Sequence, residues 1–92
     1  MESPNSFFQL KVSKNNLDEN QFIFIIPSKS IRKAVLRNKI RRRAREILKR
    51  KEDNIKKGIN LTFIFKKGAE EQSYEELEKG ISRVLDERQL IK

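Results

Sequence analysis

Neither cysteine nor histidine occurs among the 92 residues of this chain. Without cysteine there is no disulfide and no thiolate metal site, and without histidine the commonest general base and metal ligand is missing. Acids are also few, with 13 aspartates and glutamates against 22 lysines and arginines. The sequence therefore predicts no catalytic residue, no metal site and no cofactor bound by the protein itself.

Apolar residues are limited as well, at 36% of the chain. A chain of this length buries only about 60–65% of its unfolded surface, so we expect one domain over residues 1–92, with a loose start at residues 1–6. The longest apolar run, residues 22–27, is far too short to cross a bilayer. The polar N-terminus does not resemble a secretory signal, so we expect a cytoplasmic protein.

Positive charge is abundant and concentrated in one place. Residues 28–51 hold twelve bases and one acid, a balance of +11, whereas the whole chain carries +9, so the remainder sums to −2. Such density of like charge costs self-repulsion, which a polyanionic partner relieves. The block therefore favours a nucleic-acid-binding domain.

The basic block also has helical periodicity. Its apolar stripe consists of Leu36, Ile40, Ala44, Ile47 and Leu48. At about 100° per residue, the opposite side carries Asn38, Arg41, Arg42, Arg45 and Lys49. The residues at 34 and 35 do not fit the stripe, so we expect the chain still to be turning into the helix there. The helix is expected to fray near residues 53–54.

Three further segments have the apolar patterns of strands, namely residues 7–14, 21–26 and 60–65. Residues 15–20 suit a hairpin loop between the first two segments, and the unbroken apolar run at 21–26 is expected to be a central strand. After residue 68 a second helix is predicted, in which Ser73 and Glu76 have capping-box spacing. The β-β-α-β-α order predicts an α+β fold, a small single-domain sandwich of one sheet and two helices.

A resemblance to a known family rests on three blocks of residues. Residues 34–46, AVLRNKIRRRARE, resemble the arginine-rich RNR helix of the bacterial RNase P protein family, whose pattern is roughly A-V-x-R-N-R/K-I-K/R-R-x-x-R-E/Q. Residues 22–30, FIFIIPSKS, are similar to the family's apolar strand and its Ser-Lys-Lys-like turn. Residues 58–77 resemble its G-Y-D-I-V-I-A-R-P-G-A-A-x-x-S-Y-x-E-L block. As a whole, the resemblance spans about residues 7–85.

Several positions depart from the family pattern. Arg32 stands where the family usually has glycine, and a reshaped turn is implied if that glycine serves a positive φ. Lys39 keeps a charge in the RNR core but loses the bidentate fork of arginine. The other departures are Ser30, Asn60, Lys66 and Lys67. The family also begins with a basic helix and a short strand that this sequence has no room for, so either the member is short or the chain begins late.

The resemblance implies both a fold and a function. The fold would be similar to that of ribosomal protein S5 domain 2, with a left-handed β-α-β crossover. The function would be that of the protein subunit of ribonuclease P, which assists a catalytic RNA in removing the 5′ leader from precursor tRNA. The RNA would hold the catalytic Mg²⁺, and the protein would act as a monomer that contacts the RNase P RNA and the precursor tRNA.

The same resemblance implies two sets of RNA contacts. Arginine suits this role because its guanidinium pairs bidentately with phosphate and stacks on exposed bases. The predicted RNA-binding residues are Arg37, Asn38, Lys39, Arg41, Arg42, Arg45, Lys49, Lys29 and Lys33. Aromatic side chains beside positive charge suit a single-stranded leader, so the predicted leader-binding residues are Phe7, Gln9 and Lys11. A core role for Phe7 is the alternative.

Other classes of protein share parts of this pattern. A ribosomal or other structural RNA- or DNA-binding protein would share the charge block, but it would not require the downstream Ser-Tyr-x-Glu-Leu pattern. A basic amphipathic helix can lie on an anionic membrane, although here the strands need its apolar side. A protein-only nuclease would need converging carboxylates. The acids at residues 70–78 instead suit a helix start, where the helix dipole favours negative charge.

Overall fold

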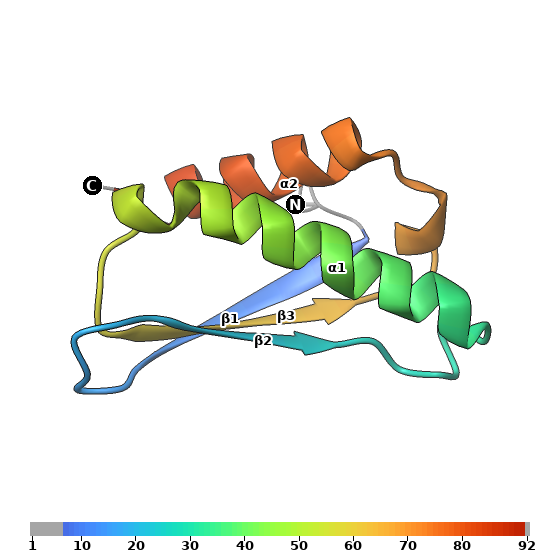
Figure 1. Cartoon of the computed structure of the whole chain (residues 1–92), viewed down its shortest axis with the longest axis horizontal. Coiled ribbons are helices and arrows are strands. Elements are labelled where there is room, and N and C mark those ends of the chain that lie inside the picture. Colours follow the sequence, from blue (N-terminus) through green and yellow to red (C-terminus); the bar gives the residue numbers. More distant parts are fainter. Residues whose placement is uncertain (1–6, 92) are drawn as a thin grey trace.

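The computed structural model describes residues 7–91, so the loose start expected at residues 1–6 lies outside the described residues. Two helices cover one face of a three-stranded sheet (Figure 1). The strands are β1 (Phe8–Lys14), β2 (Gln21–Ile25) and β3 (Ile59–Phe65), and the helices are α1 (Ala34–Lys51) and α2 (Tyr74–Glu87). Two short 3₁₀ turns, η1 (Glu52–Asn54) and η2 (Ala69–Glu71), follow α1 and precede α2. The predicted α+β class and element order are confirmed.

The central strand of the sheet is β3, and the strand order is β1-β3-β2. β3 pairs antiparallel with β1 and parallel with β2, so that Phe63 lies opposite both Leu10 and Phe24. The predictions of a hairpin between the first two strands and of a central position for β2 are therefore wrong. The apolar run of β2 suggested a strand buried on both faces. Ile23 and Ile25, however, are 41% and 44% exposed and lie on the uncovered face of an edge strand.

The connection between β1 and β2 passes the beginning of β3 and is tied to it. The backbone N–H of Asn15 donates to the carbonyl of Gly58 at 3.0 Å, and the Asn15 side chain donates to Asn60 Oδ1 at 2.9 Å. Gly58 has a φ of +82°, and a Cβ there would lie 3.0 Å from the carbonyl oxygen of Leu17, so this position requires glycine. The turn-forming residues 15–20 thus bridge the two edges of the sheet.

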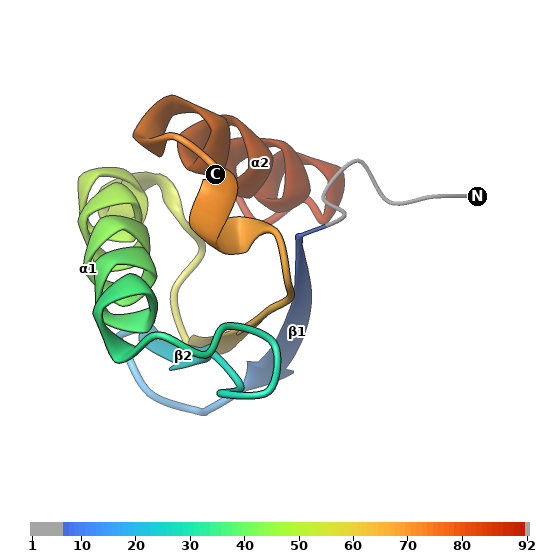
Figure 2. The ribbon, with the colours of Figure 1, turned by 90° about the vertical axis from the view of Figure 1, so that its right-hand side faces the viewer.

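Because β2 and β3 are parallel neighbours, α1 forms a crossover connection between them. Figure 2 looks along the strands, with α1 on the β2 side of the molecule and β1 on the far side of β3. The chain leaves β2, runs back along α1 above the sheet and enters β3, and this β2-α1-β3 crossover is left-handed. General rules favour the right-handed form, so only the family resemblance predicted this feature.

The core lies between the sheet and the two helices, and the predicted apolar stripe of α1 is part of it. Ile40, Ala44, Ile47 and Leu48 are at most 3% exposed, and Leu36 is half-buried against the same core. α1 begins at Ala34, and Val35 in its first turn is 70% exposed. The expectation that residues 34–35 are still turning into the helix is wrong, because the first turn of a helix can face solvent on both sides of its stripe.

α2 begins as its sequence predicts. The Ser73 side chain accepts a hydrogen bond from the backbone N–H of Glu76, and the Glu76 carboxylate accepts one from the backbone N–H of Ser73. The inward face of α2 buries Leu77, Ile81 and Leu85. The predicted capping box of this helix is confirmed.

Candidate nucleic-acid interface

One side of α1 faces away from the core and carries most of the predicted RNA-binding residues. Asn38, Lys39, Arg42, Arg45 and Lys49 are exposed, and Arg41 is half-buried. We call these six residues the α1 basic face. At 1.5 Å per residue they extend over about 17 Å of one rigid helix. The structure therefore brings together on one surface six of the nine predicted contacts.

The α1 basic face has some internal order. Arg41 Nη1 donates to the side-chain oxygen of Asn38, one helical turn earlier, at 3.3 Å. This contact uses the acceptor of the Asn38 amide and leaves its two N–H groups as donors. Asn38 can therefore donate to a phosphate, a 2′-hydroxyl or a base acceptor beside the arginines.

Three arginines of α1 are instead directed at other parts of the protein. Arg43 Nη1 donates to the carbonyl of Gln72 at 3.3 Å, and the Arg50 guanidinium lies 5.7 Å from the centre of the Tyr74 ring. Both contacts tie α1 to the start of α2. Arg37 Nη1 donates to the carbonyls of Ile31 at 2.8 Å and Arg32 at 2.7 Å. The structure thus places Arg37, a predicted RNA contact, apart from the α1 basic face.

The remaining predicted bases, Lys29 and Lys33, lie in the loop that precedes α1. The backbone N–H groups of Ser30 and Ile31 both donate to the carbonyl of Pro27, and the Ile31 side chain is 2% exposed. Within residues 7–91, the non-glycine residues with positive φ are Asn16 and Gln89. The loop therefore turns without a positive φ at Arg32, although the family usually has glycine there.

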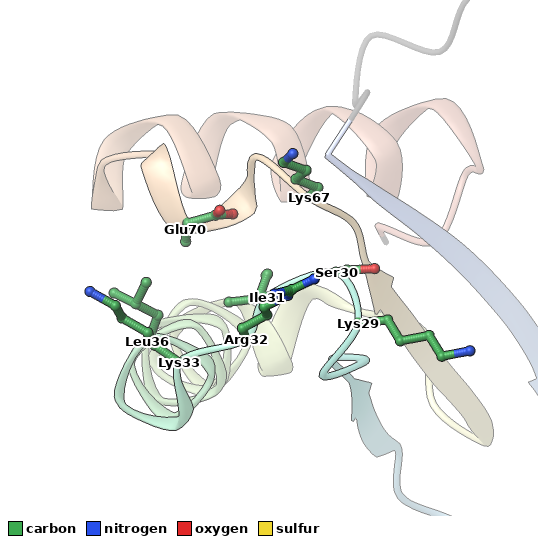
Figure 3. A pocket seen from close by; sticks show the side chains of 8 residues that line it. All are labelled: Lys29, Ser30, Ile31, Arg32, Lys33, Leu36, Lys67 and Glu70. Carbon is green, nitrogen blue, oxygen red and sulfur yellow. The ribbon is translucent and has the colours of Figure 1, made fainter.

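A cavity of about 390 Å³ opens between this loop and η2. Figure 3 shows the loop residues on one side of the cavity and Lys67 and Glu70 on the other. The Glu70 carboxylate accepts a hydrogen bond from the backbone N–H of Gly68 at 2.8 Å, so it is partly satisfied within its own turn. The charged residues that line the cavity are therefore four bases and the acid Glu70; the bases are Lys29, Arg32, Lys33 and Lys67.

The sheet face opposite the helices holds two of the three predicted leader-binding residues. Gln9 and Lys11 are both exposed there. Strand pairing places Gln9 in one row with Ile64 and Ile25, and Lys11 in the next row with Thr62 and Ile23. The two polar residues thus border an apolar surface.

Phe7 differs from its two predicted partners. It is half-buried, precedes the first residue of β1 and packs against the core. Its ring lies 5.2 Å from that of Phe8 in an edge-on arrangement. The alternative core role of Phe7 therefore accounts for part of its surface.

Sequence reasoning missed the isoleucines of the open sheet face. Ile23 and Ile25 alternate with Phe22 and Phe24, which are half-buried toward the core. An unbroken apolar strand that exposes one side was the available signal.

In the described part of the chain, no group of three or more Asp or Glu residues lies close enough to hold a metal ion. No helix within residues 7–91 is long and apolar enough to span a membrane.

Comparison with known proteins gives consistent matches. The family model described as Ribonuclease P matches residues 2–89. The chain is 35% identical over 78 residues to the ribonuclease P protein component of Pseudoalteromonas translucida, a match that covers 85% of this chain and 55% of that protein. A second ribonuclease P protein component, from Brevibacillus brevis, is 35% identical over 65 residues, or 71% of this chain and 52% of that protein. The chain thus spans little more than half the length of these curated relatives.

A solved structure of similar fold is the RNase P protein from Thermotoga maritima in complex with 1-(4-fluorophenyl)-2-thiourea. Its TM-score is 0.80 at 28% identity, and the match covers 90% of this chain and 80% of that one. The Staphylococcus aureus RNase P protein has a TM-score of 0.85 at 23% identity, with 98% and 82% covered, and shows the shared fold.

Proposed function

The chain belongs to the ribonuclease P protein family, and from this premise we propose that it is the protein subunit of ribonuclease P. In this proposal it binds the RNase P RNA and precursor tRNA as a monomer in the cytoplasm and assists removal of the 5′ leader. The RNA carries out the hydrolysis with its own Mg²⁺. This chain supplies binding and orientation, and none of its residues has a catalytic role.

The observation that carries the proposal is the α1 basic face. A folded RNA is recognised mainly through its phosphates, 2′-hydroxyls and shape, because its deep major groove excludes side chains. A rigid helix whose core side is buried presents several cations at a fixed backbone spacing, so the backbone need not be ordered on binding. Arg42 and Arg45 are exposed on neighbouring turns, and each guanidinium suits a phosphate. These features support binding of the RNase P RNA by α1.

For the precursor tRNA, we assign the 5′ leader to the open face of the sheet. Single-stranded RNA binds surfaces that combine positive charge with flat or apolar platforms. Lys11 supplies the charge, Gln9 an amide, and Ile23 and Ile25 an exposed apolar surface on the opposite edge strand, β2. Phe7, half-buried just before the start of β1, offers only the part of its ring that stays exposed.

Reconstitution tests the whole assignment. The purified protein, freed of RNA, is expected not to cleave precursor tRNA, whereas addition to a cognate RNase P RNA at low Mg²⁺ is expected to increase leader release. Cleavage by the RNA-free protein would overturn the assignment of catalysis to RNA. A protein that binds RNA but fails to stimulate the cognate RNase P RNA would instead be a structural RNA-binding protein.

The leader assignment has a narrower test with a matched control. Lys11 and Lys14 are both exposed lysines of β1, but only Lys11 belongs to the rows of the open face. In the reconstituted enzyme, Lys11→Ala is expected to lower affinity for leader-bearing precursor tRNA relative to leaderless tRNA. Lys14→Ala is expected to leave that ratio unchanged. Equal effects of the two variants on that ratio would contradict the assignment of the leader to this face.

A further inference from the structure

Arg37 is set apart from the other arginines of the RNR-like segment by its contacts. Its side chain is half-buried, and one of its terminal nitrogens donates to two successive carbonyls of the preceding loop, those of Ile31 and Arg32. Both distances, 2.8 and 2.7 Å, lie in the range of charge-assisted hydrogen bonds. The terminal nitrogen that makes both contacts is therefore committed to the loop and does not pair with a phosphate.

The position of Arg37 in its helix also points to a local role. A cation in the first turn of a helix is opposed by the helix dipole. α1 has no acid in its first turn, and Lys33 at its N-cap makes no side-chain capping hydrogen bond. In place of a capping side chain, the hydrogen bonds from Arg37 to the loop carbonyls therefore fix the path by which the chain enters the helix.

The loop that Arg37 holds is rich in cations. Lys29, Arg32 and Lys33 are all exposed, and with Lys67 they line the cavity between the loop and η2. In Figure 3, Lys29 and Lys33 point toward opposite ends of the view, so the bases are spread along the cavity instead of meeting at one point. This spread suits successive phosphates of an RNA strand better than a single small anion.

We propose that Arg37 is a positioning residue that binds no RNA itself and acts by holding residues 27–33. In this arrangement Lys29, Arg32 and Lys33 form, together with Lys67, a second phosphate-binding surface beside the α1 basic face. The proposal rests on the proposed function, since it takes RNA as the ligand. Arg32 is the contact at its centre, because its own carbonyl is one of the two that Arg37 holds.

A double-mutant cycle separates positioning from direct contact. Arg37→Met keeps an apolar stem and removes the donors, and Arg41→Met is the matched change on the α1 basic face. Each is made in the wild-type chain and in a loop variant that combines Lys29→Ala, Arg32→Ala and Lys33→Ala. Dissociation constants are measured at fixed salt for the RNase P RNA with bound precursor tRNA, after thermal melting has shown that each variant is folded.

Residues that act through one another have non-additive effects. We expect Arg37→Met to weaken binding by about five- to tenfold in the wild-type chain but by less than about twofold in the loop variant. Arg41→Met should weaken binding by the same factor in both backgrounds. An Arg37→Met effect that is equally large in the loop variant would overturn the positioning role. Wild-type affinity in the loop variant would overturn the phosphate-binding surface.

A second measurement needs no RNA. Trypsin cleaves after lysine and arginine, so the loop offers three cleavage sites whose exposure to the protease depends on how firmly the loop is held. Arg37→Met is expected to speed cleavage after Lys29, Arg32 or Lys33 at least about fivefold relative to Arg41→Met, because local opening governs such cleavage. Equal rates would show that Arg37 does not hold the loop. If the wild-type chain failed to bind either RNA, the proposed function would fall, and this measurement would still decide the role of Arg37.

Discussion

α1 and α2 lie side by side on the same face of the sheet, and each buries an apolar stripe in the same core. Their other features are opposite. α2 begins with a capping box and has Glu75 and Glu76 in its first turn, where negative charge is favourable. α1 has no capping side chain and no acid in its first turn, and its outer side is basic. Of the two, only α2 has a capped and charge-complemented start, and the basic outer side of α1 is the surface to which the proposed function assigns RNA.

The two helices also carry opposite charge on their exposed sides. Exposed acids on α2, among them Glu75, Asp86 and Glu87, lie on a different element from the α1 basic face. A polyanion is attracted to one helix and repelled by the other, which guides the direction of approach.

The largest effect is expected where the two helices are alike. Leu48 of α1 and Leu85 of α2 are both completely buried. Replacing either with alanine should lower the free energy of unfolding by about 2–5 kcal/mol, through lost burial and a residual cavity. Chemical denaturation of the two variants measures this. A much smaller loss for Leu48→Ala would mean that α1 is not firmly packed in the free protein.

A ligand effect of similar size should act through the α1 basic face and not through α2. An anion that binds only the folded basic surface stabilises it by about 2.7 kcal/mol at a hundredfold excess over the dissociation constant. We expect pyrophosphate or short RNA to raise the melting temperature more than chloride at matched ionic strength. Pyrophosphate is preferred to sulfate because sulfate also strengthens apolar burial in general.

The control for this prediction removes the basic surface. In an Arg42→Ala, Arg45→Ala double variant, the stabilisation by pyrophosphate should fall, because both residues are exposed and contribute charge to the α1 basic face. An unchanged melting temperature of the wild-type chain with either ligand would contradict a specific anion site. The same stabilisation in the double variant would move that site away from α1.

Local patterns predicted much of this fold. The capping box of Ser73 and the buried stripe of α1 follow from spacing along one helix, and both are confirmed. The order of the strands did not follow, because it depends on which strand β3 joins after the crossover. The side chains of β2 gave no signal of an edge position, since its open face is also apolar at Ile23 and Ile25.

The candidate site divides in the same way. Helical spacing predicted the exposure of Arg42, Arg45 and Lys49. It could not reveal that Arg37 turns back onto the loop, because its acceptors are backbone carbonyls, which every residue carries regardless of its side chain. Pairwise contacts between a side chain and a backbone several residues away become visible only once the turn itself is known.

Replacing a single exposed arginine should weaken RNA binding on α1 but not on α2. Arg42 lies on the α1 basic face and Arg83 on the exposed side of α2. Arg42→Ala is expected to weaken binding to the RNase P RNA by about 1–3 kcal/mol, the range for a charge-assisted contact to phosphate. It should also reduce the slope of log K against log salt by about 0.7–0.9, whereas Arg83→Ala should change neither. Equal losses from both variants would mean diffuse electrostatic attraction without a defined face.

The smallest effect concerns the helix starts. Ser73→Ala removes the side-chain acceptor of the α2 capping box and should lower the free energy of unfolding by about 1 kcal/mol. Lys33→Ala, at the corresponding position of α1, should change it by less than about 0.5 kcal/mol, because Lys33 makes no capping hydrogen bond. Urea denaturation of both variants in the absence of RNA makes the comparison. If the two losses were equal, α1 and α2 would be stabilised alike at their starts, and the contrast between a self-stabilised helix and a ligand-binding helix would not hold.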